Sequence, residues 1–115
     1  KARADLQVSE SKNDRQLRES YEHAKAQLTQ TKERVELARV QFERAKEGKA
    51  KGVISDAAYD QISTHYETQK AELIQSEASE RIAAEELKRG SASLEGTRQE
   101  LARLEAAERQ IRIEV

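Results

Sequence analysis

The segment that decides the fold is RAKEGKAKGVISDAAYD at residues 44–60. It separates two long, charged stretches of helical composition and holds two of the chain's four glycines. Gly48 or Gly52 can supply the left-handed residue that ends a first helix. Ser55 can cap the N-terminus of a second helix, with Asp56 at the positive end of that helix's dipole. We therefore predict that the chain reverses direction within this segment.

Two apolar residues flank the predicted cap and strengthen the prediction of a helix start. Ile54 and Tyr59 occupy the N′ and N4 positions of a hydrophobic staple around Ser55. The expected organisation is a single helical hairpin, with a first helix over about residues 2–49 and a second over about 55–112. The tip between them covers about residues 50–54.

The first stretch carries an apolar stripe whose members are spaced by alternating steps of four and three residues. Its nine positions are Leu17, Tyr21, Ala24, Leu28, Thr31, Val35, Ala38, Phe42 and Ala45. Eight of them are apolar or aromatic, which is the a/d pattern of a coiled coil. Upstream the same register meets Asp14, Glu10 and Gln7, so the stripe is lost there. A register shift near Leu6, or fraying of the helix, would explain this loss.

A second stripe begins at Tyr59 and keeps one phase to the end of the chain. Its positions are Tyr59, Ile62, Tyr66, Gln69, Leu73, Ser76, Glu80, Ala83, Leu87, Gly90, Leu94, Thr97, Leu101, Leu104, Glu108, Ile111 and Val115. Eleven of these seventeen are apolar or aromatic. Because the phase is unchanged through Gly90 and Gly96, we expect a continuous helix there, weakened by about 1 kcal/mol at each glycine.

Two stripes joined by a short glycine-containing segment predict an all-α fold, a long two-helix antiparallel coiled-coil hairpin. In one register, small residues of the first stripe repeatedly face large residues of the second. Two helices bury only a narrow seam, so we expect the hairpin to have neighbours in its native setting. The predicted pairs include Phe42 with Ile62, Thr31 with Leu73, and Leu17 with Leu87.

The composition argues against several classes of function. Charged residues make up 37% of the chain with a net charge of −1, and no basic block indicates a nucleic-acid partner. The chain has no cysteine, which excludes disulfides and thiolate metal sites, and no apolar run of about 18 residues that would span a membrane.

Catalytic chemistry is not expected either. The two histidines, His23 and His65, lie far apart in the predicted hairpin, and the segment GKAKG lacks the spacing of a phosphate-binding loop. A two-helix rod also offers no enclosed pocket. We expect no enzymatic activity, no cofactor and no metal site.

The segment FERAKEGKAKGVISDAAYDQI at residues 42–62 resembles the hairpin tip of bacterial membrane fusion proteins, the HlyD-like periplasmic adaptors of tripartite efflux pumps and type I secretion systems. The family pattern has an arginine followed by an apolar residue, then a leucine, a serine and an aspartate. Arg44 and Ala45 fill the first two positions. Ser55 lies eleven residues after Arg44 and Asp60 five after Ser55, as in the pattern.

One position departs from the family pattern. Gly48 stands where the family has its leucine, so the apolar side chain expected there is missing. The last residues, ERQIRIEV at 108–115, resemble the stretch in which the returning helix becomes the first strand of a lipoyl half-motif.

The resemblance implies that this chain is a segment of a longer adaptor. Such adaptors lie in the periplasm, are anchored to the inner membrane, and form rings of several copies, commonly six. Their tips meet a TolC-type outer-membrane channel, and an ATP-driven (ABC) or proton-driven transporter of the inner membrane lies at the other end. The resemblance assigns channel contact to Arg44, Ala45, Gly48, Val53 and Ser55, and the structure of the tip to Gly52, Ile54, Tyr59 and Asp60.

The alternative interpretation is a generic coiled-coil spacer or dimerisation rod. Function would then depend on arm length and on seam residues such as Leu28 or Leu73, and any glycine linker could replace the tip.

Overall fold

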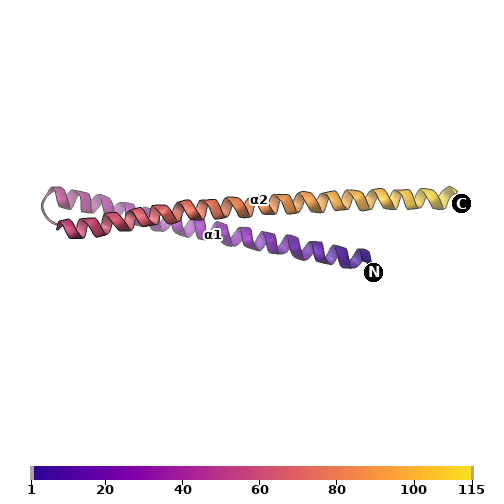
Figure 1. Ribbon diagram of the computed structural model, residues 1–115, viewed down its shortest axis with the longest axis horizontal. Coiled ribbons are helices and arrows are strands. Elements are labelled where there is room, and N and C mark those ends of the chain that lie inside the picture. The colour runs from indigo at the N-terminus through magenta and orange to yellow at the C-terminus, as the bar shows by residue number, and fades with distance from the viewer. Residues whose placement is uncertain (1, 115) are drawn as a thin grey trace. The chain divides into compact units, whose positions relative to one another are not determined.

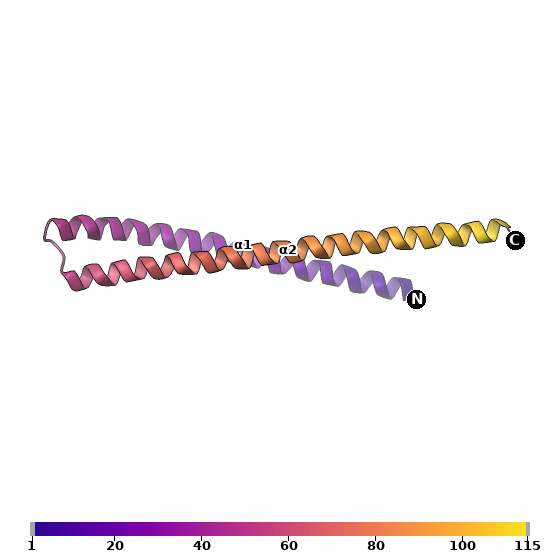
Figure 2. The same ribbon diagram turned by 45° about the horizontal axis from the view of Figure 1, so that its top comes forward.

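The computed structural model describes residues 2–114, with side chains described for residues 11–111. It contains two α-helices, α1 (Ala2–Ala50) and α2 (Asp56–Glu114), and no strand within residues 2–114. A short turn joins them, and they form an antiparallel hairpin (Figure 1). The predicted all-α hairpin is confirmed. Figure 2 shows the same turn between the end of α1 and the start of α2.

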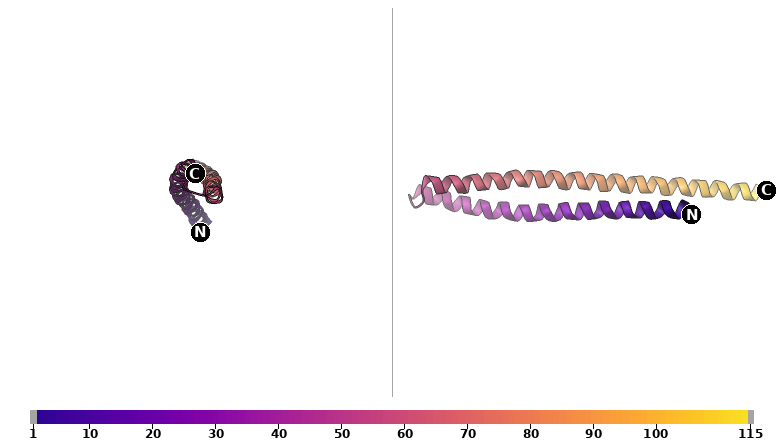
Figure 3. Two further views of the ribbon diagram at one scale, coloured as in Figure 1. Left: turned by 90° about the vertical axis from the view of Figure 1, so that its left-hand side faces the viewer. Right: turned by 60° about the horizontal axis from the view of Figure 1, so that its bottom comes forward.

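Contacts divide the chain into two units. The unit Tyr21–Ile82, here called the tip unit, contains the turn and the parts of both helices next to it. The second, here called the terminal unit, comprises Lys1–Ser20 and Ala83–Val115. In the right-hand view of Figure 3, the end of α1 lies beside the start of α2 within the tip unit.

The seam of the tip unit follows the predicted apolar stripe of α1. Every stripe position from Tyr21 to Ala45 is buried or half-buried, which confirms the a/d pattern. The most buried are small side chains, and among the described residues no large side chain is fully buried. The helices therefore approach closely along a narrow line of small residues, flanked by larger half-buried ones. The buried α1 residues are Ala24, Thr31, Ala38 and Ala45.

The register of the two helices is visible in an aromatic cluster. The Phe42 ring lies 5.9 Å from the ring of Tyr59 and 5.2 Å from that of Tyr66, measured between centroids. Ile62 lies between these two tyrosines along α2, so Phe42 is level with Ile62, as the sequence predicted. Such aromatic contacts add about 0.5–1.5 kcal/mol to the energy of area burial.

Farther along the seam, one polar contact differs from the predicted pairing. The hydroxyl of Thr31 lies 3.1 Å from that of Ser76, although Leu73 was the expected partner. Ser76 is one seam position beyond Leu73, and a seam side chain packs between successive positions of the opposite helix. Thr31 thus contacts the seam position next to the predicted one, and Leu17 likewise lies against Gly90, one seam position beyond its predicted partner Leu87.

In the terminal unit, a glycine of α2 makes room for a leucine of α1. A Cβ atom placed on Gly90 would collide with Cδ1 of Leu17. Gly96 has open space where its Cβ would be. The helix α2 continues through both glycines, as predicted. Gly90 thus serves the packing of Leu17, whereas Gly96 has no packing role that the structure shows.

Two expectations for the end of α2 are wrong. Residues 108–114 are helical rather than extended, since a strand needs a neighbouring strand for its backbone hydrogen bonds and a helix satisfies them internally. The stripe also ceases to be a seam after Leu101, because Leu104, Glu108 and Ile111 are exposed. The register places no α1 residue opposite these three. Val115 lies outside the described residues.

The structure describes only part of the region near the start of α1 in which the apolar stripe is lost. Asp14 is half-buried although it is charged, and it pairs with Arg18 at 3.7 Å. The proposed register shift near Leu6 lies outside the described side chains, as do Gln7 and Glu10.

Candidate functional site

The end of α1 is a Schellman motif. The backbone N–H of Val53 donates to the carbonyl of Gly48 at 2.8 Å, and that of Gly52 donates to the carbonyl of Lys49 at 3.0 Å. Gly52 has a φ of 72°, in the left-handed region that L side chains avoid. Of the two glycines that could end α1, Gly52 is therefore the one that adopts the required conformation.

The start of α2 is capped by Ser55, as predicted. Its Oγ accepts a hydrogen bond from the N–H of Ala58 at 3.1 Å, and its carbonyl accepts one from Tyr59 at 3.0 Å. Lys49 links the two helix ends, because its Nζ lies 3.9 Å from Asp56 and 4.3 Å from the centre of the Tyr59 ring. These contacts fix the tip as an ordered turn.

Ile54 fills the space beside Gly48. A Cβ atom at position 48 would lie 3.3 Å from Cγ2 of Ile54, which is tighter than most carbon contacts. Both residues are half-buried. The absence of a side chain at Gly48 therefore lets Ile54 fold back onto the last turn of α1.

The predicted channel-contact residues differ in their accessibility. Arg44 and Ser55 are exposed. Val53 lies at the apex of the turn, where its N–H donates to the carbonyl of Gly48, and 74% of its surface is exposed. Ala45 is only 5% exposed and lies in the seam. Asp60, assigned to the structure of the tip, is exposed on the second turn of α2.

A groove with an apolar floor lies beside the turn. Ala45, Ile54 and Ile62 form its floor, and Arg44 and Gln41 flank it, around a volume of about 440 Å³. Arg44 can donate several hydrogen bonds from a planar guanidinium to carbonyl or carboxylate oxygens. The arrangement suits an apolar side chain of a partner whose polar groups lie near Arg44.

Two further hollows on the tip unit share residues of one face of α1. One hollow of about 330 Å³ is lined by Leu37, His65 and Gln69, and Arg34 and Glu72 line both this hollow and the next. The α1 residues that line these two hollows and the tip groove are spaced by three and four positions along the chain. Residues with this spacing lie on one side of a helix. We call this surface the amide face; it consists of these α1 residues and the α2 residues that line the same hollows. Its α1 residues are Gln27, Gln30, Arg34, Leu37, Gln41 and Arg44.

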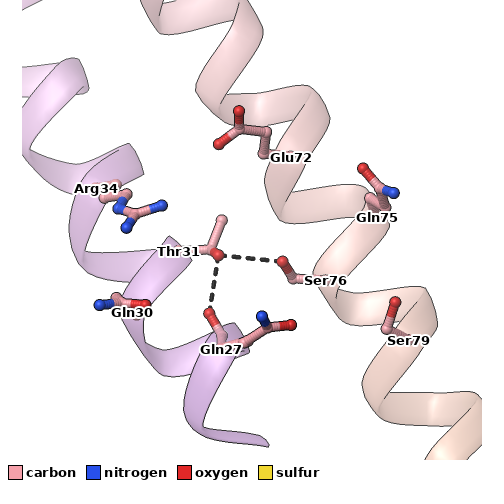
Figure 4. Close-up of a pocket in the computed structure, with 8 residues that line it drawn as sticks. All are labelled: Gln27, Gln30, Thr31, Arg34, Glu72, Gln75, Ser76 and Ser79. Carbon is pink, nitrogen blue, oxygen red and sulfur yellow. Dashed lines mark hydrogen bonds between the residues drawn. The ribbon is translucent and has the colours of Figure 1, made fainter. Parts of the chain in front are cut away.

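Figure 4 shows the hollow of about 370 Å³ farthest from the turn. Thr31 donates a hydrogen bond to the carbonyl of Gln27 at 2.8 Å and accepts one from Ser76. The side chains of Arg34 and Glu72 point into the space between the helices (Figure 4). The hollow is thus lined mainly by polar groups that can each still donate or accept hydrogen bonds.

The other side of the seam carries exposed ion pairs. Arg39 binds Glu36 at 2.5 Å and Lys70 binds Glu67 at 2.8 Å, each along its own helix. The hydrogen bond from Arg39 lowers the pKa of the Glu36 carboxyl, and the same bond raises the pKa of Arg39. The hydrogen bond to Glu67 raises the pKa of Lys70. All four groups lie at the surface, so these pairs serve solubility more than stability.

The described side chains contain no group of three or more His, Cys, Asp or Glu residues placed to hold a metal ion. Within the same range, no helix is apolar over a length that could cross a membrane. His23 and His65 are both exposed, and His65 lines a hollow of the amide face.

No protein-family profile matches this chain, and no curated protein sequence matches it. A solved structure does match: that of the periplasmic adaptor protein EmrA, with a TM-score of 0.81 and 22% identity. The match covers 91% of this chain and 32% of that one, so this chain spans about a third of the other's length. The comparison shows a shared fold.

Proposed function

We propose that this chain is the helical hairpin of a periplasmic adaptor of the membrane fusion protein type, and that its tip docks on a TolC-type outer-membrane channel. The observation that carries the proposal is the fold shared with the periplasmic adaptor protein EmrA over 91% of the chain. The tip motif of Arg44, Ser55 and Asp60 supports it independently, because a generic coiled coil has no need of that spacing.

The geometry of the tip supports a docking role. Val53 presents an exposed apolar side chain at the apex, and the groove beside Arg44 offers an apolar floor. A helical end of a channel exposes unpaired backbone carbonyls, to which the Arg44 guanidinium can donate. Ile54, folded onto Gly48, forms part of the groove floor and supplies apolar surface where the family pattern has leucine.

In this proposal the hairpin acts as a mechanical bridge and not as an enzyme. Several copies, six in the usual arrangement of the family, surround an axis in the periplasm, each in an adaptor anchored to the inner membrane. Parts of the adaptor outside this chain contact an inner-membrane transporter, either ATP-driven or proton-driven. The hairpin holds the channel at a fixed distance from the transporter.

Substitutions at the tip of the intact adaptor test the docking role. Arg44→Asp and Ser55→Arg are expected to abolish transport, with the level and oligomeric state of the adaptor unchanged. Lys46→Asp is the matched control, because it makes the same charge change two residues away on the other side of the seam. Transport that survives both tip substitutions would show that the tip is not the docking surface.

Ser55 needs a second variant, because its hydroxyl also caps α2. Ser55→Asp keeps a capping oxygen and adds a negative charge, so it separates loss of docking from loss of the cap. Replacing residues 51–55 by a glycine linker distinguishes the spacer interpretation: a spacer would keep its activity, whereas a docking tip would lose it.

A further inference from the structure

The tip groove is an apolar hollow within a charged surface. Its floor consists of Ala45, Ile54 and Ile62, and Arg44 is the only charged residue among the five that line it. Around it, most of the exposed positions between residues 43 and 61 are charged. Apolar hollows that are surrounded by polar residues are typical of the places where an interface receives an anchoring side chain.

The shape of the groove depends on a glycine. A Cβ atom at position 48 would lie 3.3 Å from Cγ2 of Ile54, so Ile54 lies against the last turn of α1 only because Gly48 has no side chain. A leucine at position 48 would displace Ile54 and add its own side chain to this surface. Where a leucine would present a protruding apolar group, this chain therefore presents a hollow.

Arg44 at the edge of the groove indicates which end of a helix fits there. Arg44 is exposed and forms no salt bridge with the side chains of residues 11–111. Its guanidinium donates hydrogen bonds and accepts none. The C-terminal end of a helix exposes carbonyl oxygens and carries partial negative charge, whereas the N-terminal end exposes further donors. The C-terminal turn of a helix is therefore the complementary partner.

We propose that the tip groove receives one aliphatic side chain, of the size of leucine or isoleucine, from the C-terminal turn of a helix of the channel. This inference rests on the proposed function and deepens it, because it states what the channel presents. The aliphatic side chain contacts Ala45, Ile54 and Ile62. The free carbonyls of the same helix end accept hydrogen bonds from Arg44.

The size and lining of the groove agree with such an occupant. A cavity of about 150 Å³ accepts a benzene-sized group. The groove of about 440 Å³ therefore has room for an aliphatic side chain and part of the backbone that carries it. Its lining contains no aromatic ring, so an aromatic occupant would find no ring to pair with.

Two variants of the intact adaptor change the groove in opposite directions. Gln41→Trp, at an exposed position of the edge, covers the floor with a large side chain, and Ile54→Ala enlarges the hollow. Each variant is expected to bind the channel about tenfold more weakly than the natural adaptor. Surface plasmon resonance with the purified channel measures the affinities.

Suppressor selection then identifies the occupant. The channel gene is mutagenised at random, and channels that restore transport to each adaptor variant are selected. Gln41→Trp should select a smaller residue at one position in the C-terminal turn of a channel helix. Ile54→Ala should select a larger apolar residue at that same position, because the enlarged hollow needs more volume to fill it.

The same substitutions elsewhere in the chain serve as matched controls. Gln27→Trp lies on the same side of α1 in the hollow farthest from the turn, and Ile74→Ala truncates an isoleucine of α2 that is 69% exposed. Both controls should bind the channel as the natural adaptor does. Far-UV circular dichroism and the oligomeric state of the adaptor check that all four variants fold.

Gly48→Leu tests which partner carries the protruding side chain. In this inference Gly48→Leu weakens channel binding, because it displaces Ile54 and brings two apolar side chains into one space. Stronger binding by Gly48→Leu would overturn the inference. So would natural affinity in both Gln41→Trp and Ile54→Ala, or suppressors that lie outside the C-terminal turns of channel helices.

These results are separate from those that test docking itself. If Arg44→Asp and Ser55→Arg abolish transport while the groove variants bind normally, the tip docks but the groove is not its receiving site. If transport survives both Arg44→Asp and Ser55→Arg, the proposed function fails and this inference fails with it.

Discussion

Ile54 and Gly48 meet across the turn, with Cγ2 of Ile54 3.3 Å from the place that a Cβ at position 48 would take. The two positions are consequently coupled. A larger residue at position 48 displaces Ile54 from the floor of the tip groove, and a smaller residue at 54 leaves room for a side chain at 48.

This coupling is measurable in a double-mutant cycle. Gly48→Leu adds helix propensity but overpacks the space that Ile54 occupies. We expect Gly48→Leu to be more favourable in an Ile54→Ala background than in the natural chain, by about 1 kcal/mol in free energy of unfolding. Urea denaturation followed by circular dichroism gives the four values. Additive effects would mean that the two residues do not share the space.

The glycines of α2 should respond oppositely to alanine. Gly96→Ala adds a methyl group in open space and should stabilise the chain by about 0.5–1 kcal/mol through helix propensity. Gly90→Ala gains the same propensity but collides with Leu17, so it should lower the melting temperature. Leu17→Ala should remove that penalty. Equal stabilisation by both alanines would contradict the close approach of Leu17 and Gly90.

This pair shows what the sequence could and could not predict. The unbroken phase of the stripe correctly predicted that α2 continues through Gly90 and Gly96. It could not distinguish the two, because their difference depends on which one lies under the Leu17 side chain of the other helix. Periodicity specifies which side of a helix faces its partner, whereas close approach depends on the rotamers of both helices.

The cap of α2 is expected to contribute measurably to stability. Ser55→Ala removes the acceptor for the Ala58 N–H and should lower the free energy of unfolding by about 1 kcal/mol. Ser55→Asp keeps an acceptor at the same position and should recover most of the loss. Thermal denaturation of the three chains tests this. If alanine and aspartate behave alike, the hydroxyl is not acting as the cap.

The polar layer at Thr31 should be replaceable at no cost in stability. Thr31→Val with Ser76→Ala removes both partners of the 3.1 Å contact and leaves no buried hydroxyl unsatisfied. We expect the double variant to be more stable by up to about 1 kcal/mol, and Ser76→Ala alone to be slightly less stable. Chemical denaturation measures both. A large loss in the double variant would show that the hydroxyl pair is essential to this level of the seam.

The tip and the amide face differ in how far the sequence anticipates them. Gly52, Ser55 and Asp60 follow local rules of turn chemistry and spacing, so residues a few positions apart sufficed to locate the turn. The amide face joins residues about forty positions apart, such as Arg34 and Glu72, and its hollows exist because the seam beside them holds small residues like Thr31 and Ala38. The glutamines of the amide face could have been found in the sequence, because they directly precede seam residues. The hollows of the amide face could not, because they depend on the packing of the two helices.

The aromatic cluster also makes the two halves of the molecule distinguishable by optical spectroscopy. The single phenylalanine, Phe42, and all three tyrosines lie within the tip unit Tyr21–Ile82, and the chain has no tryptophan. Tyrosine emission and near-ultraviolet dichroism therefore arise from one unit alone, whereas backbone absorption samples both. If the terminal unit unfolds at a lower temperature than the tip unit, the backbone signal will decrease while the tyrosine signal stays constant. This order of unfolding can be measured without an extrinsic label.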